Sequence, residues 1–276
     1  MNEYQLTASI VLYKNDDLVK QAIESFLKTT LKVKLYLVDN SPTRELQTKL
    51  AAYIKDKRIE YIFNGANIGF GAGHNVAIKK IIETSAYHLV LNPDVSFDAA
   101  ILPELLHYMQ AHNNVGVVMP KVLYPDNSVQ YLAKLLPRPF DFFVIRFLPF
   151  AFKKSQDVFR LKQSGYNKIM NVPFLSGCFL IFNTGALKKA GLFDEKIFMY
   201  TEDIDIVRRI ISSSYKSVFY PYAHIYHHHE RKSFKNLKVF GIYLKSALYY
   251  FNKWGWFFDA ERRKINRLTL DQLKQS

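Results

Sequence analysis

The feature that most constrains the fold is an alternation of short apolar runs with helical segments in the first third of the chain. The runs are rich in β-branched residues, as in strands that are buried on both faces. Repeated strand–helix alternation predicts parallel strands joined by right-handed crossovers, with helices on both faces of the sheet. The four predicted strands cover residues 8–13, 34–40, 58–63 and 87–92.

Helical periodicity occupies the intervals between these strands. The first helix has an apolar face that consists of Leu18, Ala22, Ile23 and Phe26. Asn15 or Asp16 can cap its start, because their side chains accept hydrogen bonds from the first amides of a helix. A second helix is predicted over residues 43–56, and a third follows the Gly-rich segment 64–75.

The second half of the chain is less regular. It predicts helices over residues 99–112 and 201–214, and strands over 115–124 and 217–229. Residues 170–183 fit a strand or a hairpin arm, whereas the aromatic and basic residues 137–165 carry no clear period.

Two acidic residues follow predicted strands directly. Asp39 ends the second strand, and Asp94 comes after the Asn92–Pro93 break that ends the fourth. Each could be a solvated turn acid, but parallel strands deliver their carboxyl ends to one crevice, where ligands bind. There a carboxylate can accept from a ribose or a base, or hold a hard cation.

The loop at residues 64–75 is rich in glycine but matches neither a dinucleotide fingerprint nor a P-loop. It is either a flexible turn before a helix or a place where the backbone approaches an anionic ligand.

Three acids, Glu202, Asp203 and Asp205, crowd one predicted helix start. Acids there complement the helix dipole, which explains one or two of them. A carboxylate in a partly dry site can also serve as a general base.

Four histidines, His224, His227, His228 and His229, follow one another closely near residue 227. They are either surface residues at a strand exit or part of a metal site, although the sequence has neither an HExxH motif nor the cysteine partners of a zinc site.

Cys178 is the single cysteine, which excludes a disulfide within the chain and favours a reducing compartment. The N-terminus resembles no signal peptide, and no apolar run is long enough to span a membrane.

The chain is basic, with a formal net charge of +14. Residues 221–276 hold eleven Lys or Arg against four Asp or Glu, a net of +7, and nine aromatic residues lie between Phe240 and Phe258. This tail either packs on the core or forms an amphipathic segment on an anionic membrane surface. Nucleic-acid binding is the alternative explanation of the positive net charge, but the sequence contains no recognised nucleic-acid-binding motif.

Seven segments, taken in order, resemble motifs of glycosyltransferase family 2, whose inverting enzymes have the GT-A fold. They are SIVLYKND, LVDNS, NIGFGAGHN, LNPDV, FLSGCFLIF, GLFDEKIFMYTEDID and HHHERKS. The motifs are most similar to those of the bacterial rhamnosyltransferase-like branch, which builds O-antigen, capsule and other envelope polysaccharides. The resemblance extends over about residues 7–235. It implies a Rossmann-like, mostly parallel sheet, with residues 1–98 binding the nucleotide sugar and 99–235 the acceptor.

The resemblance also implies roles for individual residues. Asp39 and Tyr13 would contact the nucleoside, Asn67 and His74 would line its pocket, and Asn92 would lie beside the donor. Asp94 would ligate a divalent Mg or Mn ion on the donor diphosphate, with His229 as a possible further ligand. Asp203 would be the general base, supported by Glu202, while Asp205 and Tyr200 would face the acceptor. The sequence departs from the family's DxD motif, because Asn92 stands where the first acid is expected.

The predicted activity is metal-assisted transfer of a sugar, with inversion, from a nucleotide-diphosphate sugar to a polyprenyl-diphosphate-linked or saccharide acceptor. The donor predicted from the branch is dTDP-rhamnose, and a UDP-hexose is the alternative. Residues 236–276 are predicted to hold the enzyme on the cytoplasmic face of the bacterial inner membrane. A sugar-nucleotide-binding protein without catalysis is the other alternative, and the Glu202–Asp203 pair argues against it.

Overall fold

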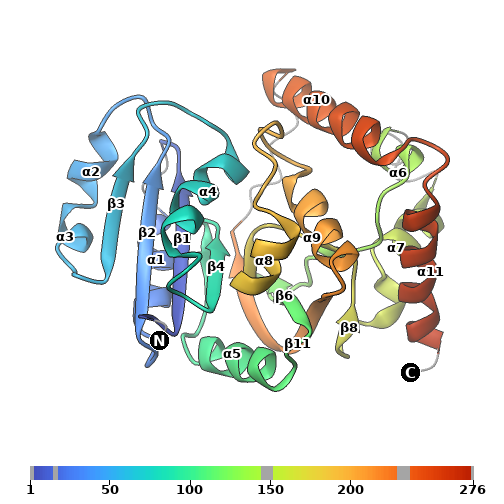
Figure 1. Cartoon of the computed structure of the whole chain (residues 1–276), viewed down its shortest axis with the longest axis horizontal. Coiled ribbons are helices and arrows are strands. Elements are labelled where there is room, and N and C mark those ends of the chain that lie inside the picture. The colour runs from blue at the N-terminus through green and yellow to red at the C-terminus, as the bar shows by residue number, and fades with distance from the viewer. Residues whose placement is uncertain (1–2, 15–17, 144–151, 229–236, 275–276) are drawn as a thin grey trace.

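The computed structural model describes residues 3–14, 18–143, 152–228 and 237–274. Its main sheet begins with four parallel strands in the order β3-β2-β1-β4, which confirms the predicted alternation (Figure 1). The register aligns Leu12 at the end of β1 with Asp39 at the end of β2, so these carboxyl ends lie at one edge. The strands are β1 (Leu6–Leu12), β2 (Val33–Asp39), β3 (Ile59–Phe63) and β4 (Tyr87–Leu91).

Helices cover both faces of this part of the sheet, as predicted. Helix α1 (Val19–Leu27) buries Ile23 and Phe26 in the main core, and α4 (Phe70–Ile81) packs Ile81 against Val38 on the opposite face. The predicted cap of α1 is wrong, because Leu18 occupies the N-cap position and makes no side-chain capping bond. Asn15 and Asp16 lie outside the described residues.

Residues 43–56 form two short helices rather than one. Helix α2 (Glu45–Lys49) ends at Leu50, whose backbone is not helical, and α3 (Ala51–Ile54) follows. Leu50 is fully buried, so packing of its side chain fixes the break between the two helices.

Beyond β4 the sheet also contains antiparallel strands, but β6 and β11 run in the same direction as β1 to β4, so the sheet is mostly parallel, as predicted. Strand β10 runs antiparallel to both of its neighbours, β4 and β6, while β11 runs parallel to β6. The strands added here are β5 (Val95–Ser96), β6 (Val115–Leu123), β8 (Met170–Asn171), β10 (Phe179–Asn183) and β11 (Lys216–His227). Their helices are α5 (Ile101–Ala111), α8 (Thr184–Ala190) and α9 (Glu202–Ser212).

Residues 137–165, which carry no clear period, and the segments on either side of them form a small substructure. Strands β7 (Ala133–Lys134) and β9 (Phe174–Leu175) form a small antiparallel ribbon beside the main sheet. Two helices, α6 (Pro139–Phe143) and α7 (Lys153–Phe159), flank it. The predicted strand over residues 170–183 is therefore three strands, β8, β9 and β10, in two sheets.

The C-terminal residues form α10 (Leu237–Trp254) and α11 (Ala260–Lys274), which pack on the second half of the chain (Figure 1). Tyr243, Tyr250 and Phe251 of α10 are buried in an apolar cluster with Phe142 and Ile204. Most aromatic side chains of α10 therefore belong to the core. In the part of the chain that the structure describes, no helix combines the length and apolar character needed to cross a bilayer.

Candidate active site

A cleft of about 920 Å³ lies beyond the carboxyl ends of the parallel strands. Tyr13 follows β1, Asn40 follows β2, and Asn92 and Asp94 follow β4, and all four side chains line the cleft. Asn67, from the loop between β3 and α4, also lines it. The predicted convergence at one crevice is therefore found for these residues. The opposite wall comes from α6, α7 and α10.

The loop before α4 is held tightly rather than flexibly. Gly69 has a φ of +95°, and a Cβ atom there would lie 2.6 Å from the carbonyl oxygen of Phe198. Asn67 Oδ1 accepts a hydrogen bond from the Gly69 amide at 3.1 Å, and the Phe70 amide donates to Phe198 at 2.9 Å. Only glycine fits this position, which brings the loop against the segment that leads to Glu202.

Asp94 lies beside His227, one of the four candidate histidines, whereas the family resemblance implied His229 as the ligand. Strand β11 pairs His227 with Val95, so His227 Nε2 comes within 3.4 Å of Asp94 Oδ1. The His228 amide donates to the Asp94 carbonyl at 2.8 Å, which fixes the two segments together. The predicted ligand His229 lies outside the described residues.

The hydrogen bonds of Gln130 determine which ring nitrogen of His227 carries a proton when the ring is neutral, and so which atom faces Asp94. Gln130 Nε2 donates to the carbonyls of His227 and Leu123, so Gln130 Oε1 is the atom that faces His227 Nδ1, at 3.0 Å. Nδ1 therefore carries the proton, and in neutral His227 the lone pair of Nε2 points at a carboxylate. A proton or a metal cation between Nε2 and Asp94 relieves that repulsion.

The neighbouring groups suit a divalent cation. Asn92 Oδ1 is buried and has no hydrogen-bond partner among the described residues. Together with Asp94 and His227 it offers a carboxylate, an imidazole and an amide oxygen, a set that fits Mn²⁺ better than Mg²⁺. Within the described ranges, no group of three or more His, Cys, Asp and Glu side chains gathers to hold a metal. The protein would thus supply only part of the coordination shell.

Glu202 and Asp203 begin α9 at the floor of the cleft. Asp203 is 9% exposed and accepts hydrogen bonds from the amides of Gly177 (3.0 Å) and Ile204 (2.8 Å). Burial raises the pKa of both carboxyl groups, and the charge of Asp203 raises the pKa of Glu202 further. The two amides partly offset the burial of Asp203. The two carboxyl groups therefore share one buried site in which two negative charges are unfavourable.

Of the two residues predicted to face the acceptor, Tyr200 lines the cleft and Asp205 is buried in the core. Tyr200 lines the cleft with a φ of +92°, a conformation that a tyrosine adopts only under constraint from its surroundings. Asp205 is fully buried and does not line the cleft. Its carboxylate accepts from Arg209 and Trp254, each at 2.8 Å, and pairs with Lys253. Its position supports an anchoring role rather than contact with an acceptor.

Two residues expected at the nucleoside are also buried away from the cleft lining. Asp39 accepts from the Ser41 amide at 2.8 Å and from the Tyr61 hydroxyl, and Asn40 lines the cleft in its place. His74 is fully buried, and its Nδ1 is hydrogen-bonded to Ser9 Oγ at 2.7 Å. Both side chains stabilise the sheet and α4 rather than facing the cleft.

The family profile described as Glycosyl transferase family 2 matches residues 7–191, which is more than half of the chain. The chain belongs to glycosyltransferase family 2. This matched region contains the loop at Gly69 and the Asp94 side of the cleft, and it ends before α9.

Two known rhamnosyltransferases are similar to this chain over most of its length. An N-acetylglucosaminyl-diphospho-decaprenol L-rhamnosyltransferase of Mycobacterium tuberculosis is 28% identical over 212 residues, which cover 73% of this chain and 68% of that protein. Rhamnosyltransferase WbbL of Escherichia coli is 26% identical over 274 residues, which cover 96% of each chain.

Solved structures of glycosyltransferases share the fold at low identity. GalNAc-T7 with UDP, GalNAc and Mn²⁺ superposes with a TM-score of 0.62 at 14% identity, over 83% of this chain and 44% of that chain. The mannosyltransferase PcManGT from Pyrobaculum calidifontis, with GDP-Man and Mn²⁺, gives 0.60 at 12% identity, over 99% of this chain and 76% of that one. The fold is the GT-A fold, as the sequence motifs implied.

Proposed function

We propose that this chain is an inverting glycosyltransferase that uses a nucleotide-diphosphate sugar to extend a lipid-linked or saccharide acceptor in cell-envelope polysaccharide synthesis, as in O-antigen or capsule. The observation that carries the proposal is a single cleft that holds both the Asp94–His227 pair and the buried Asp203 carboxylate. dTDP-rhamnose is the proposed donor, because both relatives described above are named rhamnosyltransferases. A UDP-hexose is the alternative donor.

Asp203 acts as the general base in this proposal. Its carboxylate takes the proton of an acceptor hydroxyl while the hydroxyl oxygen attacks the anomeric carbon. The bond from that carbon to the donor phosphate breaks on the opposite side, so the configuration inverts and the nucleoside diphosphate leaves. In this proposal Glu202 is protonated, so it adds no second negative charge that would keep Asp203 itself protonated before the reaction.

Asp94, His227 and Asn92 would hold a Mn or Mg ion against the donor diphosphate. When bound, the metal supplies positive charge where the leaving diphosphate becomes more negative. Tyr13, Asn40 and Asn67 would contact the nucleoside end of the donor, since they line the neighbouring part of the cleft.

A thermal-shift panel tests donor and metal together. dTDP-rhamnose, UDP-galactose, UDP-glucose, UDP-GlcNAc and GDP-mannose are each added with and without Mn²⁺. We expect one donor to raise the melting temperature with Mn²⁺, because a ligand of the folded state alone stabilises it. Asp94→Asn is expected to abolish the part of this shift that requires Mn²⁺. A Mn²⁺-independent shift that is equal in wild type and variant would contradict the assigned metal site.

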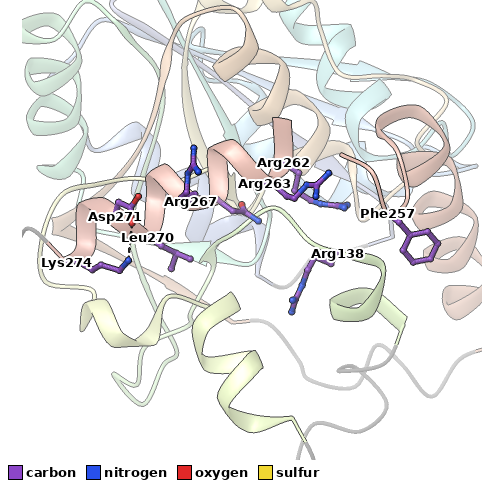
Figure 2. A pocket seen from close by; sticks show the side chains of 9 residues that line it. Arg138, Phe257, Arg262, Arg263, Arg267, Leu270, Asp271 and Lys274 are labelled. Carbon is purple, nitrogen blue, oxygen red and sulfur yellow. Dashed lines mark hydrogen bonds and ion pairs between the residues drawn. The ribbon is translucent and has the colours of Figure 1, made fainter. Parts of the chain in front are cut away.

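The surface of α11 supports a peripheral position on the cytoplasmic face of the membrane. Figure 2 shows a groove of about 380 Å³ with Arg263 and Arg267 along one helix and Phe257 beyond its start. Phe257 is 72% exposed and Phe258 92% exposed. Arg263 and Arg267 are exposed, and neither forms an ion pair with any residue that the structure describes. Exposed aromatic and basic side chains together favour an anionic lipid surface.

Co-sedimentation with anionic vesicles tests this surface. A variant with Phe257→Ser, Phe258→Ser, Arg263→Gln and Arg267→Gln should bind at least about tenfold more weakly, since each basic residue contributes about 1 kcal/mol near such a surface. Substitution is preferable to truncation, because removing α10 would uncover Phe142 and Ile204, which are buried against it. The control Lys20→Gln with Lys55→Gln removes two exposed charges elsewhere and should bind normally. If the four-residue variant and the control lost vesicle binding to the same extent, this surface would not be the membrane-binding site.

A further inference from the structure

Part of the cleft lining combines cationic and apolar side chains. Lys134 and Arg160 line it, together with aromatic residues of α6, β9 and α10. Asp141 is the acid on this wall, and it is engaged by Arg138 through three hydrogen bonds of 2.8–2.9 Å. The wall therefore offers positive charge to a ligand that enters the cleft.

The two cations stand on segments that are fixed to each other. The Leu135 amide donates to the Phe159 carbonyl at 3.0 Å, which joins the chain just after Lys134 to the chain just before Arg160. The hydroxyl of Tyr166 donates to the carbonyls of both Ala133 and Arg160, and Tyr166 is fully buried. A buried tyrosine thus ties together the backbone that carries Lys134 and Arg160.

Lys134 of this cationic pair lies close to the proposed base. Lys134 pairs with Phe174 across the β7–β9 ribbon, and three residues later the Gly177 amide binds Asp203. The positive charge of Lys134 lowers the pKa of Asp203, which opposes part of the effect of burial. A group attached to an acceptor sugar at Asp203 would therefore lie within reach of Lys134.

An apolar wall extends from the cations along α6 and α10. Phe142 and Tyr243 stack with ring centroids 5.2 Å apart, and both side chains line the cleft. Val239 and Ile242 of α10 line it as well. Apolar lining next to paired cations matches a ligand with a charged head and a hydrocarbon chain.

We propose that Lys134 and Arg160 bind the diphosphate of a lipid-diphosphate-linked acceptor, whose hydrocarbon chain lies along Phe142, Ile242 and Tyr243. This assignment rests on the proposed transferase function and adds the acceptor's site to it. Arg and Lys bind phosphate oxygens through charge-assisted hydrogen bonds, and the arginine can do so with two parallel bonds. The cleft would then hold two diphosphates, the donor's at Asp94 and the acceptor's at Lys134 and Arg160.

Calorimetric titration with farnesyl diphosphate in EDTA tests this site without a donor or a metal. We expect the wild type to bind, and the double variant Lys134→Met, Arg160→Gln to bind at least about tenfold more weakly, since two charge-assisted contacts are lost. Asp94→Asn should bind as the wild type does, which separates this site from the donor's. The control Lys154→Met with Lys168→Met removes two exposed charges outside the cleft and should also bind normally.

The outcomes of this titration and of the donor panel are distinguishable. Failure of the wild type to bind farnesyl diphosphate, or equal weakening in the double variant and in either comparison protein, would overturn the acceptor site alone. The absence of any donor shift would count against the transferase function itself. Melting curves of each variant establish that the protein is folded before it is titrated.

Discussion

Replacing Asp203 with asparagine is expected to lower kcat by about 100- to 10,000-fold, the usual contribution of a general base. Asparagine keeps the size of the side chain, but its one amide oxygen can accept from only one of the Gly177 and Ile204 amides, which bind different oxygens of the Asp203 carboxylate. It cannot take the proton of an acceptor hydroxyl. The loss should therefore fall on kcat, while the donor-induced thermal shift persists.

The pH dependence gives an independent check on this base. Burial raises the pKa of Asp203, so the rate should fall as pH decreases through a value above the ordinary range of an aspartate. Glu202→Gln is the matched control, because glutamine resembles the protonated Glu202 and should leave that acid limb in place. Retention of more than a tenth of the activity by Asp203→Asn, or loss of the acid limb in Glu202→Gln, would assign the base elsewhere.

Replacing Arg208 with methionine is expected to lower the free energy of unfolding by about 3–5 kcal/mol, the cost of removing one partner from a buried ion pair. Arg208 is 1% exposed and donates to both oxygens of Asp259 at 2.7 Å. It also pairs with Glu261 and lies 4.1 Å from the ring centre of Trp254. The variant leaves the Asp259 carboxylate buried without its guanidinium partner.

Chemical denaturation monitored by tryptophan fluorescence measures this effect, since Trp254 and Trp256 lie at the junction of α10 and α11. Arg267→Met is the matched control on the exposed side of α11, and it should change stability by about 0.5 kcal/mol or less. A similar midpoint for both variants would show that α9 is not held by the C-terminal helices. The ion pair also fixes the helix that carries Glu202 and Asp203, so the same contacts position the proposed base.

Local pattern was sufficient to predict the first half of the fold. Short apolar runs and helical periods are properties of neighbouring residues, and they located β1 to β4 and the edge where Asn92 and Asp94 emerge. The antiparallel course of β10 was not predicted. Its direction depends on pairing with β4 and β6, which are distant in sequence.

The same reason explains the site residues that were missed or placed differently. His227 reaches Asp94 only because β11 pairs with β5, and no spacing in the sequence indicates that contact. Lys134 lies in a strand that was not predicted and Arg160 in the segment without a clear period, so their place in the cleft depends on tertiary packing. Asp39 and His74 match family motifs, yet both side chains are held in the core, Asp39 by the nearby Ser41 amide and His74 by Ser9, which is 65 residues away in the sequence.

Transfer itself is the most direct test of the proposed function. Purified wild type is incubated with dTDP-rhamnose, Mn²⁺ and N-acetylglucosaminyl-diphospho-farnesol, and the product is examined by mass spectrometry and NMR, with Asp203→Asn and Asp94→Asn in parallel. We predict one added sugar with inverted anomeric configuration in the wild type, and strongly reduced product in both variants. A product with retained configuration, or equal product from Asp203→Asn, would contradict the account of Asp203 as the base in an inverting cleft.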